Sequence, residues 1–167
     1  GGTVKNLEIA GTVKGSNCVG AIAGYATLGS LIDNCHVTAS VTGTEENVGG
    51  IVGIANNSTI SNCRVDGKVT GGPNMVGGIV GWLHNSSRVF NCVVGTKVKI
   101  TGTFLTVGGI AGYATEGDAV IANCASLGSV ALGSGGDVNN SHFGGIVGCV
   151  GSIHSLSIYG CYSACTV

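Results

Sequence analysis

Charge, proline and aromatic side chains are all scarce in this sequence of 167 residues. Charged residues make up 9% of the chain, with 7 basic and 8 acidic side chains, so we expect no field that gathers nucleic acid or an anionic membrane. No apolar run approaches the roughly 20 residues of a membrane-spanning helix. Because hydrophobic residues reach 44%, disorder is not expected either. The composition predicts one folded domain over 1–167, without membrane insertion.

Helix signals are missing as well. One proline accompanies 32 glycines, unlike collagen, which needs abundant proline and a strict three-residue period. Apolar residues do not keep a helical spacing beyond two turns, whereas Thr, Val, Ile and Ser are plentiful. We therefore predict an all-β chain. No charged leader followed by an apolar segment opens the sequence, so it shows no signal peptide.

What the sequence has instead is a repeat. The segment Val-Gly-Gly-Ile-Val-Gly returns with few changes, beginning at Val19, Val48, Val76, Val107 and Phe143, so that successive spacings are 29, 28, 31 and 36 residues. An Asn-Cys pair follows four of these copies, and Gly160-Cys161 follows the fifth. The repeats are a half repeat over 1–18 and full copies over 19–47, 48–75, 76–106, 107–142 and 143–167. Because the chain begins and stops inside a repeat, we expect a fragment of a larger protein.

A repeat of this length cannot bury an apolar face alone, but stacked copies give each strand a neighbour above and below. The predicted fold is a parallel β-solenoid of about six coils of 28–36 residues, with roughly three short strands per coil. Stacking in register predicts three ladders of equivalent residues. The first is Leu7, Cys35, Cys63, Cys92, Cys124 and Cys161. The second is Ile22, Ile51, Ile79, Ile110 and Ile146. The third is Val13, Val41, Val69, Val98 and Val130.

The motif itself resembles the GLUG-motif repeat family. Gly50-Ile51-Val52-Gly53 and its equivalents carry the resemblance, with Ala21 replacing one glycine in the first copy and Ile standing where the family name implies Leu. Such repeats occur in large bacterial cell-surface and secreted proteins, including adhesin-like proteins and the non-catalytic portions of immunoglobulin A peptidases. The resemblance implies an extracellular or cell-surface module and supplies no catalytic residues.

Eight cysteines allow more than one interpretation. Stacking would bring the Cα atoms of the cysteine ladder to about 4.8 Å, within the range of disulfides. Their side chains would point the same way along the ladder, so we predict free thiols that fill a core column. Cys149, Cys161 and Cys165 gather near His142 and His154 in the last coil, but no CxxC or HxxxH spacing supports zinc. We expect no metal and no cofactor.

Catalysis is not indicated either. No Gly-x-Ser-x-Gly segment is present, and acids such as Asp33, Asp66 and Glu116 occupy different repeat positions, whereas glycoside chemistry needs converging carboxylates. The asparagines at the repeated bend, with Asn34 and Asn62 as examples, suit a polar ladder that supports the backbone. We therefore assign no catalytic residue and predict that the chain is not an enzyme.

One position remains a candidate site. The residue after the last motif glycine is Tyr25, Ile54, Trp82, Tyr113 or Cys149. Stacked, these residues form a partly aromatic stripe, and aromatic faces suit sugar rings or apolar partner surfaces. The alternative is that the stripe packs into a corner of the solenoid, because both sides of the strand are apolar. Tyr25, Trp82 and Tyr113 are the predicted partner-binding residues, with Trp82 as the leading one.

The predicted function is a non-catalytic structural or adhesive module of a bacterial cell-surface or secreted protein. Its expected partner is a host or cell-surface protein or a glycan. The alternative is a carbohydrate-binding or carbohydrate-processing β-helix fragment, which requires a groove with converging carboxylates or exposed aromatic residues.

Overall fold

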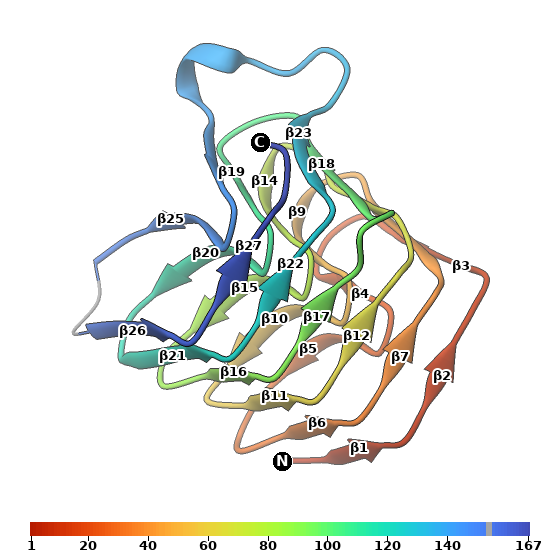
Figure 1. The fold of residues 1–167 in the computed structure, drawn as a ribbon, viewed down its shortest axis with the longest axis vertical. Coiled ribbons are helices and arrows are strands. Elements are labelled where there is room, and N and C mark those ends of the chain that lie inside the picture. Colours follow the sequence, from red (N-terminus) through yellow and green to blue (C-terminus); the bar gives the residue numbers. More distant parts are fainter. Residues whose placement is uncertain (153–154) are drawn as a thin grey trace.

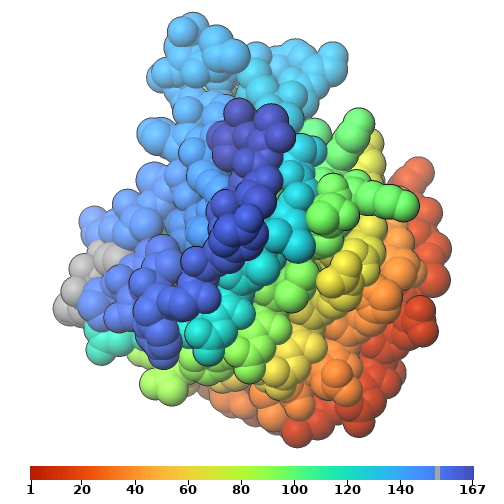
Figure 2. Space-filling model, in the orientation of Figure 1, coloured from red at the N-terminus to blue at the C-terminus, as the bar shows by residue number. Residues whose placement is uncertain are grey.

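Equivalent β-branched residues in each repeat pair with the same residues of the next repeat, and this makes every sheet of the molecule parallel. The computed structural model describes residues 1–152 and 155–167. All 22 strand pairings are parallel, and each joins strands of successive repeats. The turns lie side by side along the solenoid as bands that run from the N-terminal to the C-terminal colour (Figure 1, Figure 2). The prediction of a parallel β-solenoid is confirmed.

Each complete turn contains five short strands, which form five sheets that we name A to E. Sheet A contains β1 (Thr3–Lys5), β6 (Leu31–Asp33), β11 (Thr59–Ser61), β16 (Arg88–Phe90), β21 (Asp118–Ala122) and β26 (Ser155–Tyr159). Sheet B contains β2 (Glu8–Ile9), β7 (His36–Val37), β12 (Arg64–Val65), β17 (Val93–Val94), β22 (Ala125–Ser126) and β27 (Tyr162–Ser163). Sheet C contains β3 (Thr12–Gly15), β8 (Ser40–Gly43), β13 (Val69–Thr70), β18 (Lys99–Gly102) and β23 (Ser129–Leu132).

The other two sheets carry the Val-Gly-Gly-Ile-Val-Gly motif. Sheet D contains β4 (Val19–Gly20), β9 (Glu46–Gly49), β14 (Asn74–Gly77), β19 (Thr106–Gly108) and β24 (His142–Gly144). Sheet E contains β5 (Ala23–Ala26), β10 (Val52–Asn56), β15 (Val80–His84), β20 (Ala111–Thr115) and β25 (Val147–Val150). A 3-10 turn, η1 (Val138–Asn140), lies in the loop between β23 and β24 that projects from the stack (Figure 1). Among the described residues, no helix is long and apolar enough to cross a membrane.

Two details of the predicted coil are wrong. The chain completes five turns and adds two strands of another, one complete turn fewer than predicted. Each turn has five strands instead of three, because the backbone bends at residues that are not glycine. Three columns of residues adopt positive φ values of 48–60° and bend each turn: Asn6, Asn34, Asn62, Asn91 and Asn123; Cys18, Asn47, Met75 and Leu105; Leu28, Asn57, Asn85 and Glu116. Of these residue types, only Asn visits this region readily, so the bends at Cys18, Leu28, Met75, Leu105 and Glu116 had no sequence signal.

The predicted ladders are largely confirmed. Backbone hydrogen bonds join Ile22 to Ile51, Ile51 to Ile79, and onward through Ile110 to Ile146. Sheet C contains one register error, since Ile100 and not Val98 pairs with both Val69 and Val130. An extra turn causes it, in which the Val98 amide donates to the Gly95 carbonyl at 3.2 Å.

The motif glycines allow close contact between backbone segments. A Cβ atom on Gly77 would lie 2.0 Å from the Val80 carbonyl oxygen, and one on Gly81 would lie 2.6 Å from the Val48 nitrogen. The second motif glycine, such as Gly78, lies across the core from the valines of sheet B. The interior is therefore thin and filled by fully buried Ile and Val side chains, each worth about 1.5–3 kcal/mol of hydrophobic stabilisation.

Candidate functional site

The stripe predicted from the sequence does form, on sheet E. Ile54 pairs with Tyr25 on one side and Trp82 on the other, Trp82 pairs with Tyr113, and Tyr113 pairs with Cys149. Their exposure is uneven: Tyr25 is 51% exposed, Ile54 is 8% exposed, and Trp82 and Tyr113 are half-buried. The stripe therefore lies at the surface but is partly covered, and its role in partner binding stays a prediction.

Hydrogen bonds fix Trp82 and Tyr25 differently. The Trp82 indole N–H donates to Thr115 Oγ1 at 2.6 Å, and the Trp82 ring lies 4.6 Å from the His84 ring at an angle of 50°. The Tyr25 hydroxyl accepts a bond from Asn56 Nδ2 at 2.9 Å. Trp82 thus has its polar edge already occupied by the protein, which leaves its ring face as the part that could contact a partner.

A small hollow of about 260 Å³ lies beside Tyr113, where sheets D and E meet. It is lined mainly by apolar atoms, from Met75, Leu105, Thr106, Tyr113, His142 and Cys149. The register places Thr106 next to His142 and Tyr113 next to Cys149, so the two lining pairs come from successive turns. Nothing in the sequence marks Met75, Leu105 or Thr106 as neighbours of the stripe, because they come from another sheet.

Thr106 is the unusual member of this lining. It is 6% exposed, and its hydroxyl finds no hydrogen-bond partner among the described residues. Buried hydroxyl groups in folded proteins are almost always hydrogen-bonded, because an unpaired one costs free energy. The hollow therefore combines an aromatic ring, an imidazole and a threonine whose buried hydroxyl has no partner among the described residues.

A second hollow, of about 430 Å³, lies over the repeated bend of the first three turns. Polar and apolar atoms contribute about equally to its surface, and its lining is Asn6, Leu7, Glu8, Asn34, Cys35, His36, Asn62 and Arg64. Arg64 donates to both carboxylate oxygens of Asp66 at 2.6 and 2.8 Å, and His36 Nε2 lies 2.8 Å from the same carboxylate. The Arg64 guanidinium, followed by the His36 hydrogen bond, lowers the pKa of Asp66 against the opposing effect of burial. Arg64 is thus already neutralised within the protein.

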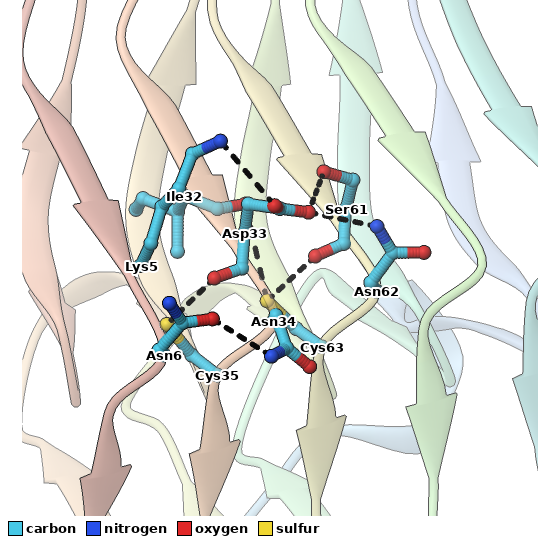
Figure 3. Close-up of polar contacts among 9 residues, drawn as sticks. All are labelled: Lys5, Asn6, Ile32, Asp33, Asn34, Cys35, Ser61, Asn62 and Cys63. Atoms are coloured by element: carbon cyan, nitrogen blue, oxygen red, sulfur yellow. Dashed lines mark hydrogen bonds and ion pairs between the residues drawn. The ribbon is translucent and has the colours of Figure 1, made fainter.

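The carboxylate of Asp33 is held at the same bend. Asn62 Nδ2 and Ser61 Oγ donate to its Oδ1 at 2.7 and 2.8 Å, and Lys5 Nζ lies 3.6 Å from Oδ2 (Figure 3). These hydrogen bonds, that of Asn62 first, lower the pKa of Asp33. The asparagines also form part of the predicted ladder, since Asn34 donates to Asn6 at 2.8 Å and Asn91 donates to Asn62 at 3.0 Å. The bend therefore uses its polar groups for structure.

All eight cysteines are free thiols, as predicted for the cysteine ladder. Cys35, Cys63, Cys92 and Cys124 are buried, whereas Cys161 is half-buried at the last turn. The last-coil cysteines do not assemble: Cys149 lines the hollow beside Tyr113, Cys161 continues the thiol column, and Cys165 lies against Gly145. His154 lies outside the described residues. Within the described part of the chain, no group of three His, Cys, Asp or Glu residues could hold a metal ion.

Two stretches of the chain match a known family of repeats. The family described as "The GLUG motif" matches residues 15–42 and 44–70. These stretches cover two successive motif copies, and they run through β5 and β10 of the stripe. The match confirms the resemblance read from the sequence, and the chain is a parallel β-solenoid that carries GLUG motifs.

The fold also resembles a solved structure. The crystal structure of "a putative immunoglobulin A1 protease" from Bacteroides ovatus superposes with a TM-score of 0.74 over 96% of this chain, at 23% sequence identity. This chain spans 57% of the length of that one. At this level of identity, the likeness shows the fold alone. A search among curated proteins gives no significant match.

Proposed function

We propose that the chain is a non-catalytic module of a secreted or cell-surface protein, which extends the protein and presents a binding face. The observation that carries the proposal is the combination of GLUG motifs with a stack of equivalent turns whose polar groups serve the bends. Repeats of this kind give a long surface made of equivalent positions, on which shallow contacts can accumulate.

The placement of the acids supports the non-catalytic part of the proposal. Asp66 is bound to Arg64 and His36, Asp33 is bound at the bend, and Asp118 accepts a bond from Ser155 at 2.8 Å. Of the residues that line the two hollows, Glu8 is the single carboxylate. A glycosidase of the common type needs a pair of carboxylates about 5–10 Å apart around the substrate.

The location can be tested on intact cells of the source organism. Antibodies against the purified chain should label the cell surface or the culture medium, and brief treatment of intact cells with an external protease should remove the surface signal. A soluble cytoplasmic protein that resists the protease until the cells are lysed would contradict the proposal.

The absence of catalysis is tested separately with the purified chain. Incubation with immunoglobulin A and with a panel of polysaccharides should give no cleavage above a heat-denatured control. Cleavage that disappears in Glu8→Gln or Asp33→Asn would establish an enzyme and end this part of the proposal.

A further inference from the structure

The hollow beside Tyr113 has chemistry that the stacking of GLUG repeats does not require. Most of its walls are apolar, yet a buried Thr106 hydroxyl without a partner among the described residues lies in them, and His142 pairs with Thr106 in the register. A solenoid needs only an apolar or self-satisfied residue at this position. We propose that this hollow binds one pyranose ring of a glycan.

Size is the first argument for a single ring. Sites for drug-sized ligands measure about 300–1,000 Å³, and this hollow, at about 260 Å³, is smaller. It has room for one ring-sized group and not for a folded peptide segment. Because it is open to solvent on one side, the rest of a glycan chain would remain outside.

The lining gives the second argument, since a pyranose has an apolar C–H face and a rim of hydroxyl groups. Tyr113 provides an aromatic face for the C–H side, and Met75 and Leu105 provide apolar walls. Thr106 Oγ1 can donate one hydrogen bond and accept others, and the His142 ring can donate or accept. An apolar side chain of a protein partner would leave the Thr106 hydroxyl unpaired, whereas a sugar hydroxyl would satisfy it.

The surroundings of the hollow supply the third argument. Tyr113 is both a wall of the hollow and a member of the aromatic stripe, next to Trp82 in the register. Sugars that follow the bound ring could therefore lie along the stripe, and their weak contacts would add to the affinity. The inference deepens the proposed function, because it names the ligand class of the binding face.

The test uses the full chain and a panel of methyl pyranosides with the gluco, galacto, manno and N-acetylglucosamine configurations. Saturation-transfer NMR at millimolar sugar should show contact with at least one of them. Thr106→Val keeps the shape of the side chain and removes the hydroxyl, so it should weaken that binding by about three- to tenfold. The melting temperature should stay the same or rise, because the hydroxyl makes no hydrogen bond with the described residues.

Two further variants separate the hollow from the rest of the stripe. Tyr113→Ala should weaken binding by about tenfold or more, as is usual for a central aromatic contact. Tyr25→Ala probes the part of the stripe outside the hollow. Tyr162→Ala, at an exposed tyrosine of sheet B outside both the stripe and the hollow, is the matched control and should leave binding unchanged. If Tyr113→Ala does not fold, Thr106→Val still decides the question.

The inference is overturned if none of the pyranosides receives saturation, or if binding is the same in Thr106→Val and the unaltered chain. Binding that is lost in Tyr25→Ala but not in Thr106→Val would also overturn it, because the sugar would then lie on the open stripe. A negative result would leave the surface location and the absence of cleavage unaffected. Conversely, a cytoplasmic location would end the proposed function without abolishing sugar binding by the purified chain.

Discussion

Each thiol of the cysteine column donates to the carbonyl oxygen two residues before it, at the bend where the intervening residue has positive φ. That residue is Asn in four copies and Gly160 before Cys161. Cys63 Sγ lies 3.0 Å from the Ser61 oxygen, and Cys124 Sγ lies 3.2 Å from the Ala122 oxygen. The same carbonyl accepts the backbone N–H of the Asn in the preceding turn, as Ser61 does from Asn34. The thiol therefore bonds to the second lone pair of a carbonyl oxygen that already accepts a backbone N–H. In this way the polar backbone of the bend is hydrogen-bonded where it borders the apolar core.

The buried thiols should resist chemical modification in the folded protein. The neighbouring thiols Cys124 and Cys63, and then burial, raise the pKa of Cys92 well above its usual value. Reaction with a disulfide reagent at pH 8 should modify the half-buried Cys18, Cys149 and Cys165 first, and Cys92 only after denaturation, as followed by mass spectrometry of peptides.

The same shift makes stability depend on pH. Because the folded state holds the Cys92 proton more tightly, this thiol makes the free energy of unfolding fall as the pH rises above the ordinary thiol pKa of about 8.5. Cys63 and Cys124 act in the opposite sense, because their hydrogen bonds to Cys92 lower their pKa. Cys92→Ala should show a smaller fall over that range. Rapid modification of Cys92 without denaturant would contradict the buried column.

Trp82 and Tyr25 should respond differently to truncation although both belong to the stripe. Trp82→Ala removes a half-buried ring and its bond to Thr115, so the free energy of unfolding should fall by about 2–3 kcal/mol, less than for a fully buried aromatic residue. Tyr25→Ala should cost less than about 1 kcal/mol, because the side chain is 51% exposed. Denaturant unfolding measures both. Equal losses of unfolding free energy in the two variants would mean that the position in the stripe, and not burial, sets how much each side chain contributes to stability.

Among the elements, the bends place stricter demands on residue type than the strands do. Strands of two to five residues are joined by residues with left-handed backbone, and three columns of such residues recur in the turns. Asn tolerates this conformation, and its side chain continues the column through hydrogen bonds between turns. The bend is therefore stabilised both within one turn and between turns.

Asn91 tests the two contributions of the bend. Asn91→Gly tolerates the left-handed backbone without strain but loses the hydrogen bond to Asn62. The free energy of unfolding should therefore fall by about 1 kcal/mol. Asn91→Ala loses the same bond and also places a side chain without local polar groups at φ 50°, which adds about 1–2 kcal/mol. Denaturant unfolding of both variants measures the difference. Equal stability of the Ala and Gly variants would show that the left-handed conformation carries no strain here.

At the scale of the whole molecule, each turn lies against its neighbours as a band (Figure 2) and pairs with them through five sheets. The core is a set of continuous columns. Stability in such a stack is a sum of the stability of the turns and of the interfaces between them. A defect in a middle turn should therefore weaken both sides of the stack, whereas one at the end should be local.

Gly77 in a middle turn and Gly2 in the first turn provide this comparison. A Cβ atom on Gly77 would lie 2.0 Å from a backbone oxygen, whereas one on Gly2 meets nothing within 4 Å. Gly77→Ala should cost about 3 kcal/mol or more, with loss of hydrogen-exchange protection in the turns on both sides. Gly2→Ala should be neutral. Protection lost only within the turn of Gly77 would contradict cooperative stacking.

The sequence was enough to predict the candidate stripe but not its surroundings. Tyr25, Trp82 and Tyr113 recur at one repeat position, so their alignment in sheet E follows from the period. Their exposure does not follow, because the strand is apolar on both sides. The hollow beside Tyr113 needs Met75 and Thr106 from sheet D, Leu105 from the bend before β19, and His142 after the projecting loop. None of these shares the repeat position of the stripe.

The sequence by itself determined the period, the parallel stacking and the ladders of Ile and Cys. The reason is that stacking in register gives the apolar residues of every repeat the same buried neighbours. Only the tertiary structure decided the five-strand turn, since bends at Met75, Leu105 and Leu28 depend on backbone conformations that these residue types rarely adopt. It also decided that Ile100 replaces Val98 in its ladder, because an inserted turn shifts the register without changing the apolar pattern. The repeat shows which residues are equivalent in successive turns. The bends and the inserted turn decide which of those residues lie on the same face of the solenoid.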